Sequence, residues 1–248
     1  MKKTFVPCLF MAVLCISSCK KETESVDRHT AKPKSSGLAL SPGEIHNLVL
    51  QDYIDRYGLE HDDETTFDEA RTLCLHIAEL SAAAGFTGNL SPAEMTGRVM
   101  QNSMDAGFFE NGILKSPDEI NALCIQQIEN PSIRTALLQI SALADQGSAD
   151  FRQESGQILS QLAHLTPDER KMMDGFGSVL DHSLVLWSGK PSLEALVIKL
   201  KVALSDALGY IQGYNYSIKT GDSQETATQF ALSEAKFYSA RTAKKLGA

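Results

Sequence analysis

The chain has 248 residues, of which 43 % are hydrophobic, and a formal net charge of −8 at pH 7. This content is enough to build a buried core, which excludes a disordered protein and predicts one large domain or two small ones. The acidic balance argues against nucleic acid as a partner, because phosphates require a basic surface. Any membrane association must come from lipid or apolar surface, since a polybasic patch is missing.

The first eighteen residues have the layout of a cleavable signal peptide. Lys2 and Lys3 give a cationic start, and an apolar run follows from Phe5 to Ile16, ahead of two serines. This run is too short for a permanent membrane-spanning helix, which needs about 20 residues. The sequence therefore predicts that residues 1–18 are removed.

The end of this segment, Ile16-Ser17-Ser18-Cys19, resembles the lipobox of bacterial lipoproteins. The resemblance implies that Cys19 carries a diacylglyceryl group, that cleavage occurs just before it, and that its new amino group is acylated with a fatty acid such as palmitate. Two or three acyl chains hold a protein on a membrane far better than one chain does. The alternative is an ordinary secretory signal that is cut elsewhere and leaves Cys19 as a plain thiol.

Residues 19–40 are predicted to form a lipidated, flexible tether, because they are rich in charge, Ser and Pro and have no apolar period. No aspartate follows Cys19, which by the sorting tendency of lipoproteins implies the outer membrane of a Gram-negative cell. The stretch Lys20-Lys21-Glu22-Thr23-Glu24 resembles the surface-export signals of Bacteroidetes lipoproteins, although Thr23 interrupts the acidic pair. The same charges also suit a plain soluble tether, so the side of the membrane stays open.

From residue 41 onward the sequence is punctuated by capping boxes, in which a hydroxyl residue stands three positions before a glutamate. Four of the five have proline at the first helical position, where its missing N–H costs nothing. The hydroxyl residues are Ser41, Thr66, Ser91, Ser116 and Thr166. Apolar residues at helical spacing follow these starts, and further helical stretches are expected near 132–144, 151–165, 193–211 and 223–246. Residues 41–248 are therefore predicted to be an all-α domain, a bundle or array of seven to nine antiparallel helices without strands.

The five capping residues are spaced by twenty-five positions or a multiple of it. A fixed period in this range can indicate structural repeats. However, only the helix start and an apolar cluster correspond between units, and the register fails at Ser141. The spacing is also what a four-turn helix plus a loop would produce, so both interpretations stay open.

Two cysteines, Cys74 and Cys124, remain in the body after the signal peptide is removed and Cys19 is lipidated. Both lie on apolar helical faces at the same distance after a capping box. In an oxidising compartment they could form a disulfide. Buried, unpaired thiols fit the same pattern.

The sequence contains no motif of an enzyme or a metal site, since HExxH, GxSxG and a glycine-rich phosphate loop are all missing. The acidic stretch of residues 60–64 fails as a calcium loop, because Phe67 stands where glycine is required. His76 with Glu79, and Asp181-His182 near two serines, are better explained as ordinary helix-borne residues. We therefore expect no catalytic residues, no metal and no cofactor.

Tyr210, Tyr214 and Tyr216 form a cluster near the C-terminus beside Gly209 and Gly213. Two glycines four residues apart would let two helices approach closely. The stretch also resembles the Gly/Ala-rich helical C-termini of Bacteroidetes lipoproteins. The tyrosines are either an exposed patch that binds a protein or glycan partner, or ordinary packing between helices.

Together these patterns favour a protein of the cell envelope that is anchored to the membrane by lipid and presents a helical binding module. The alternative is an envelope enzyme, a hydrolase with an unrecognised active site. Phe108 and Phe109, just before Asn111, are a second choice for residues that anchor a partner.

Overall fold

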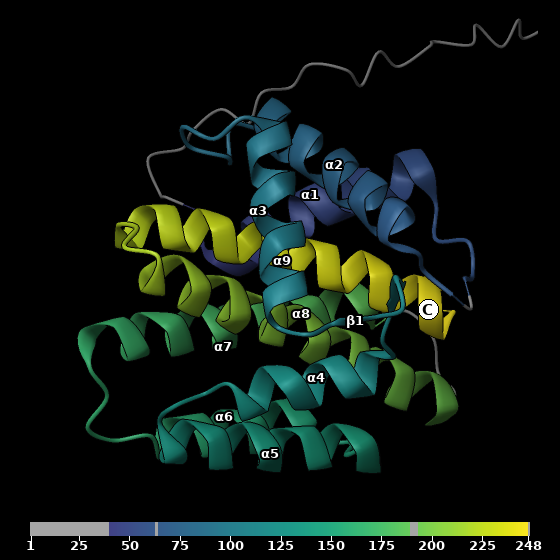
Figure 1. Ribbon diagram of the computed structural model, residues 1–248. Coiled ribbons are helices and arrows are strands. Elements are labelled where there is room, and N and C mark those ends of the chain that lie inside the picture. The colour runs from purple at the N-terminus through teal and green to yellow at the C-terminus, as the bar shows by residue number, and fades with distance from the viewer. Residues whose placement is uncertain (1–39, 63, 189–192, 248) are drawn as a thin grey trace, which may run out of the picture. The chain divides into compact units, whose positions relative to one another are not determined.

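The computed structural model describes residues 40–62, 64–188 and 193–247, and these form nine α-helices and one two-stranded sheet (Figure 1). The all-α prediction is confirmed. The elements are α1 (Pro42–Tyr57), α2 (Phe67–Ala83), α3 (Pro92–Asp105), β1 (Phe109–Glu110), β2 (Ile113–Leu114), α4 (Pro117–Gln126), α5 (Pro131–Gln146), α6 (Phe151–Ser160), α7 (Pro167–Trp187), α8 (Leu193–Lys219) and α9 (Gln224–Leu246).

All five predicted capping boxes are present, at the starts of α1, α2, α3, α4 and α7. At each, the hydroxyl accepts from the backbone N–H of the glutamate, and the glutamate carboxylate accepts from the N–H of the capping residue. Two further helices are capped by residues that the sequence analysis did not single out. Asn130 caps α5 and Ser223 caps α9.

A small β-hairpin interrupts the helices between α3 and α4, where no strand was expected. Phe109 pairs with Leu114 and Glu110 with Ile113, around a turn in which Asn111 has φ 52° and Gly112 has φ 80°. Asn-Gly is the preferred pair for a tight hairpin turn, because both positions require a positive φ. The strands are too short for the alternating pattern that identifies a strand in a sequence, so only the turn was visible.

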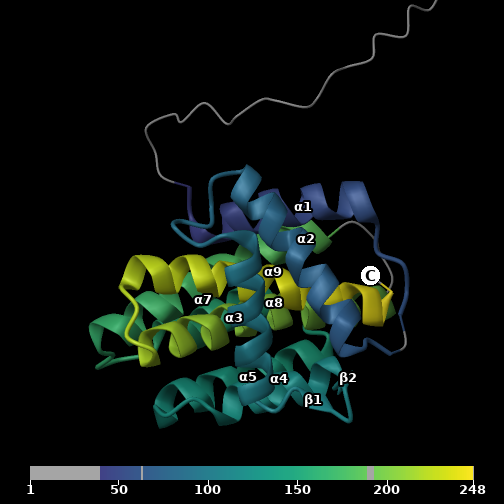
Figure 2. The ribbon, with the colours of Figure 1, turned by 45° about the horizontal axis from the view of Figure 1, so that its top comes forward.

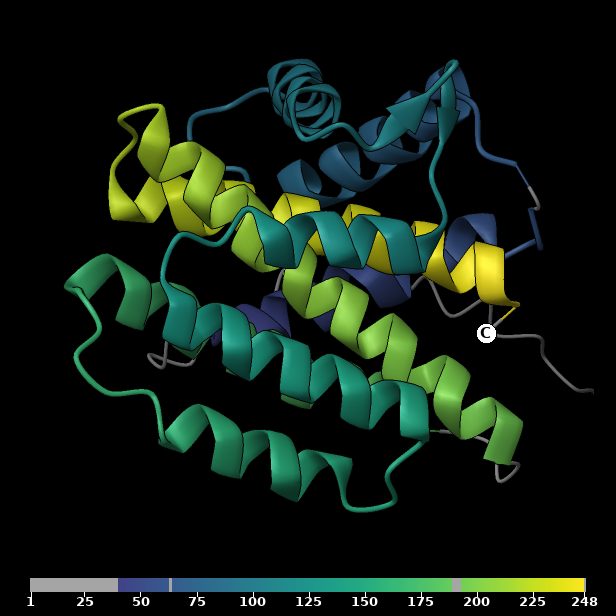
Figure 3. The same ribbon diagram turned by 60° about the horizontal axis from the view of Figure 1, so that its bottom comes forward.

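The antiparallel neighbours α8 and α9 form the centre of the described fold (Figures 1 and 2). α1, α2 and α3 pack against α9, whereas α4, α5 and α7 pack against α8. α6 lies beside α5 (Figure 3) and also contacts α7. Every helix that starts with a capping box therefore contacts this central pair. Structural repeats instead contact mainly their neighbours in the chain, so the spacing of twenty-five residues reflects helix and loop length.

Gly209 and Gly213 allow the close approach of α8 and α9. A Cβ atom at Gly213 would lie 2.7 Å from the Cα of Ala231, and one at Gly209 would lie 3.1 Å from the Cα of Ala235. The predicted role of these glycines is confirmed. As a result α9 is enclosed, with every residue from Phe230 to Ala243 buried.

None of the described helices combines the length and the apolar character that crossing a membrane requires.

Candidate binding pocket and the polar interior

The tyrosine cluster is part of the packing and does not form an exposed patch. Tyr210 and Tyr214 are each only 1 % exposed, and their rings stack with centroids 6.2 Å apart. A Cβ at Gly175 on α7 would lie 2.2 Å from the Tyr210 ring, so that glycine makes room for it. Tyr216 is half-buried against Phe230, with ring centroids 5.6 Å apart. The exposed-patch interpretation is wrong because α8 is covered by neighbouring helices.

Phe108 and Phe109 were the second choice for exposed residues that anchor a partner, and this prediction is wrong for Phe108. Phe108 is fully buried and meets the Tyr238 ring edge-on, with centroids 5.7 Å apart. Phe109 is half-buried and packs on Phe67 at 5.2 Å. The β-hairpin holds both rings against the core.

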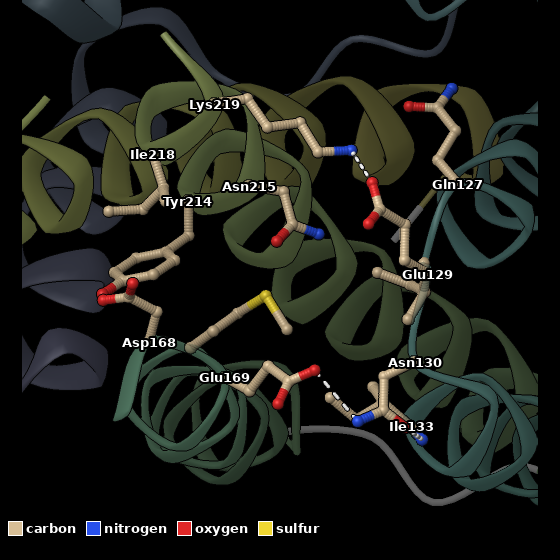
Figure 4. A pocket seen from close by; sticks show the side chains of 12 residues that line it. Gln127, Glu129, Asn130, Ile133, Asp168, Glu169, Tyr214, Asn215, Ile218 and Lys219 are labelled. Carbon is tan, nitrogen blue, oxygen red and sulfur yellow. Dashed lines mark hydrogen bonds and ion pairs between the residues drawn. The ribbon is translucent and has the colours of Figure 1, made fainter. Parts of the chain in front are cut away.

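Tyr214 nevertheless lines a surface pocket of about 180 Å³, which we call the acidic pocket (Figure 4). It lies where the loop between α4 and α5 meets the first turns of α7 and the last turns of α8. Its lining residues are Gln127, Ile128, Glu129, Asn130, Ile133, Asp168, Glu169, Met172, Tyr214, Asn215, Ile218 and Lys219. Among them the sequence analysis named Tyr214 as a binding candidate, and it used Asp168 and Glu169 only as part of the capping box that starts at Thr166.

Three carboxylates and one ammonium group provide the charges of the acidic pocket. The Lys219 Nζ lies 2.8 Å from Glu129 Oε1, and both side chains are exposed (Figure 4). Glu169 accepts from Asn130 Nδ2 at 2.9 Å and from the Thr166 backbone N–H at 2.8 Å. Asp168 instead accepts a hydrogen bond at 2.6 Å from Nε2 of Gln224, which does not line the pocket. The pocket is therefore net acidic.

The carboxylates of Glu129 and Glu169 are ionised at neutral pH. The hydrogen bond from Lys219 holds the pKa of Glu129 below its usual range. The backbone hydrogen bond from Thr166, with help from Asn130, does the same to the pKa of Glu169. Favourable hydrogen bonds to the charged form are the physical cause in both cases.

The Tyr214 hydroxyl is buried and has no hydrogen-bond partner in the described structure. Burial raises the pKa of Tyr214 to about 12, and the negative charge of Asp168 adds to this rise. The hydroxyl therefore keeps its proton at neutral pH. A buried hydroxyl without a partner costs free energy, which makes it the most unusual polar atom of the pocket.

A smaller pocket of about 110 Å³ adjoins the acidic pocket and shares Gln127, Asn215 and Lys219 with it. A chain of side-chain amides leads inward from it. Gln212 Nε2 donates to Gln127 Oε1 at 3.1 Å and to Asn102 Oδ1 at 3.2 Å. Asn102 Nδ2 in turn donates to Glu234 Oε1 at 2.8 Å. The chain connects the surface to a carboxyl group in the core.

Glu234 belongs to a group of sealed ionisable side chains that we call the polar interior, together with Lys236, Arg241, His46 and Asp206. Three of them lie on α9, which is enclosed by its neighbours. Burial raises the pKa of Glu234 to about 8 and that of Asp206 to about 7. Burial also lowers the pKa of Lys236 to about 7, that of His46 to about 4 and that of Arg241 to about 10. Desolvation disfavours the charged form of each group.

The polar interior contains few direct ionic contacts. His46 Nε2 lies 3.8 Å from Asp206 Oδ2, and Trp187 Nε1 donates to the same oxygen at 3.3 Å. Lys236 Nζ donates to Ser81 Oγ at 2.7 Å. Among the described residues, one oxygen of Glu234 and two nitrogens of Arg241 have no hydrogen-bond partner. A histidine and an aspartate in contact could serve catalysis, but both are fully buried and neither lines the two pockets described above.

The two body cysteines are free thiols in the structure, so the disulfide interpretation is wrong and the unpaired alternative describes them. Cys74 and Cys124 are both buried. Burial raises the pKa of both thiols, with the nearby carboxyl group of Glu234 adding to the rise. Reactive thiols require a lowered pKa, so these two are inert side chains of the core.

Of the remaining sequence candidates, His76 lies apart from both regions, whereas His182 lies next to the polar interior, since its carbonyl oxygen accepts from Nδ2 of Asn47, the residue that follows His46, at 2.8 Å. The His76 ring stacks on Tyr57 with centroids 4.3 Å apart. His182 Nδ1 lies 2.8 Å from the carbonyl oxygen of Ser178 in its own helix. Within residues 40–62, 64–188 and 193–247, no three His, Cys, Asp or Glu side chains converge in a way that could hold a metal ion.

The predicted signal peptide and the lipidated Cys19 lie outside the described residues. A comparison of the chain with models of protein families, with curated proteins and with solved structures finds no match in any of the three. The chemistry of the two regions is therefore the basis for a functional proposal.

Proposed function

We propose that the chain is a lipid-anchored protein of the bacterial cell envelope whose helical body binds a partner through the acidic pocket. The observation that carries the binding role is the unpartnered Tyr214 hydroxyl in a concave, net acidic site. The anchor rests on the sequence Ile16-Ser17-Ser18-Cys19 and on the charged stretch that follows it. Together they describe a module that is presented to the envelope on a tether.

The size of the pocket favours recognition of one protruding group over the binding of a whole substrate. Sites for drug-sized ligands measure roughly 300–1,000 Å³, and the acidic pocket measures about 180 Å³. A single side chain or one sugar unit suits such a volume. The partner is therefore a larger molecule, a protein or a glycan, that inserts one group.

The charge states of the pocket also favour binding over hydrolysis. A general acid at neutral pH needs a carboxyl group whose pKa is raised, whereas the pKa values of Glu129 and Glu169 are lowered. The carboxyl groups with raised pKa, Glu234 and Asp206, are fully buried. An envelope hydrolase would need one of these groups to reach a substrate.

Site-directed photocrosslinking in cell envelopes tests the binding role. A benzophenone amino acid in place of Asn215, at the pocket, should give a discrete crosslinked product when the cells are irradiated. The same amino acid in place of Leu48, which is exposed on α1, is the matched control and should give none. Equal products at both positions would contradict a binding site at the pocket.

The anchor is tested separately by Cys19→Ala. This variant should lose labelled fatty acid and accumulate as a precursor, because the acylated sulfur and the cleavage signal are both removed. Labelled fatty acid in the Cys19→Ala protein would refute the lipid anchor and leave the pocket proposal standing.

A further inference from the structure

The acidic pocket combines apolar walls with a charged rim, and this combination restricts what can occupy it. Ile128, Ile133, Met172 and Ile218 contribute apolar side chains to the lining. The carboxylates of Glu129, Asp168 and Glu169 are part of the same lining. An occupant must therefore pair an apolar stem with a polar end that neutralises negative charge.

An anionic group is disfavoured although the first turn of α7 faces the pocket. Helix starts usually bind anions through free backbone N–H groups. Here Pro167 has no N–H, the Glu169 N–H donates to Thr166, and the Thr166 N–H donates to the Glu169 carboxylate. Apart from the Asp168 N–H, the donors at this helix start are thus already used, and the carboxylates repel a further negative charge.

The hydrogen-bonding capacity left in the pocket is mainly that of acceptors. Asp168 uses one carboxylate oxygen for Gln224. Glu129 uses one oxygen for Lys219. An ionised carboxylate offers about four lone-pair positions, so both groups can accept more hydrogen bonds. The Tyr214 hydroxyl has no partner within the described part of the chain and can also accept.

We infer that the acidic pocket takes the cationic side chain of an arginine or lysine from a basic segment of a partner protein. The methylene stem would pack along the isoleucine and methionine side chains, as long cationic side chains commonly do. The charged end would donate to Asp168, Glu129 and the Tyr214 hydroxyl. The formal charge of −8 on the chain complements a basic partner. This inference rests on the proposed binding function and names its partner class.

A binding experiment on the full-length chain, purified from cell envelopes in detergent, tests this inference. The probe is a capped pentapeptide, acetyl-Gly-Ser-Arg-Ser-Gly-amide, and a second peptide carries lysine at the centre. Citrulline and norleucine replace the cationic residue in two neutral control peptides of nearly the same shape. Binding is followed by the ¹³C shifts of the Met172, Ile133 and Ile218 methyl groups.

We expect the cationic peptides to shift these methyl signals and the neutral peptides to leave them in place. Asp168→Asn should weaken binding roughly fivefold, because it removes one charge at the rim. Tyr214→Phe should weaken binding about as much, because it removes an acceptor without changing the shape of the pocket. Asp52→Asn is the matched control, since it removes a charge from the exposed ion pair with Arg56 and should have no effect.

Two results would overturn the inference. Equal shifts from the citrulline and arginine peptides would show that the positive charge is irrelevant. Shifts from a trimer of N-acetylglucosamine, without shifts from the cationic peptides, would assign the pocket to a glycan. In both cases the photocrosslink at position 215 would persist, whereas its loss would refute the proposed function itself.

Discussion

The acidic pocket and the polar interior use the same residue types under opposite conditions. Glu169 in the pocket accepts from a backbone N–H and from Asn130, and its pKa is lowered. Glu234 in the interior accepts from Asn102, keeps one oxygen without a partner among the described residues, and has a pKa raised to about 8. Access to water and the number of donors decide which way each carboxyl group shifts.

The difference separates what the protein can offer to a partner from what it must stabilise internally. Carboxylates at the pocket are charged and reachable, so they suit the recognition of a cation. The ionisable groups of the polar interior do not line the acidic pocket. Each of them destabilises the fold when it is charged, because burial disfavours the charged form. Substitutions in the two regions should therefore affect different properties, binding in one and pH-dependent stability in the other.

The largest expected effect is that of Glu234→Gln on the pH dependence of stability. The folded protein keeps the proton of Glu234 between its ordinary pKa of 4.5 and about 8, whereas the unfolded chain releases it. The stability contributed by this group is thus fully present below pH 4.5 and is lost as the pH rises through about 8. Gln keeps the acceptor for Asn102 and removes this loss. Relative to the parent, the variant should gain on the order of a few kcal/mol between about pH 5 and pH 8.

Urea unfolding at about pH 5 and pH 8, the two ends of this window, measures the gain, and Glu129→Gln at the pocket rim is the control. Glu129 is exposed and is already ionised at both pH values. The difference between the control and the parent should therefore be the same at both ends of the window. If the difference in unfolding free energy between Glu234→Gln and the parent were also the same at both pH values, the contrast between the two regions would be refuted.

Lys236→Met should give the next largest effect, with the opposite pH dependence. Burial lowers the pKa of Lys236 from 10.5 to about 7, so its stability contribution is present above pH 10.5 and is lost as the pH falls through about 7. Methionine fills a similar space without a charge. Ser81 would still donate to the Ile77 carbonyl at 2.8 Å, so no hydroxyl proton is left unpaired.

We expect Lys236→Met to be about 2 kcal/mol more stable than the parent at about pH 6, as for other buried charges replaced by apolar side chains. The gain should shrink as the pH is raised toward about 10. Thermal unfolding over this pH range measures it. A variant that is less stable than the parent at the acidic end would show that the ammonium group is well solvated or paired in the core.

Ser116→Ala gives a smaller effect, at a half-buried helix start outside both regions. The Ser116 hydroxyl accepts from the backbone N–H of residue 119 at 3.3 Å and begins α4. Its loss should destabilise the protein by about 1 kcal/mol, which urea unfolding at a single pH can measure. A threonine side chain at this position should retain the cap, so Ser116→Thr is the control. If Ser116→Thr lost as much stability as Ser116→Ala, the effect would come from packing and not from the hydrogen bond.

The helix starts could be predicted because a capping box is local. Ser116 and its glutamate are three residues apart, and their geometry follows from the backbone of one turn. The close approach at Gly209 and Gly213 was also predictable, since two small residues four positions apart lie on one face of a helix. In both cases the residues that matter, the capping pair or the two glycines, lie within a short stretch of the chain.

The pocket and the polar interior could not be predicted, because their residues come together only in the folded chain. Glu129, Asp168 and Lys219 are far apart in sequence, and none belongs to a binding motif, although Asp168 lies within a capping box. The enclosure of α9 was hidden for a different reason. Its charged side chains give that helix the composition of a surface helix, and only its position beside α8 buries them. The burial of Tyr210 and Tyr214 followed from the same position.

Of these substitutions, Tyr214→Phe should change stability least. It is informative because the same substitution should weaken binding. The hydroxyl is buried without a partner in the described structure, so the parent already bears the cost of its desolvation. Phenylalanine keeps the ring that stacks on Tyr210 at 6.2 Å and removes only the oxygen. Stability measured by urea unfolding should stay within about 0.5 kcal/mol of the parent or rise slightly. Binding of the arginine peptide should nevertheless weaken, because the guest would supply the missing partner of this hydroxyl. A clear loss of stability would instead mean that the hydroxyl holds the fold together, and the pocket would then lose the polar atom that distinguishes it.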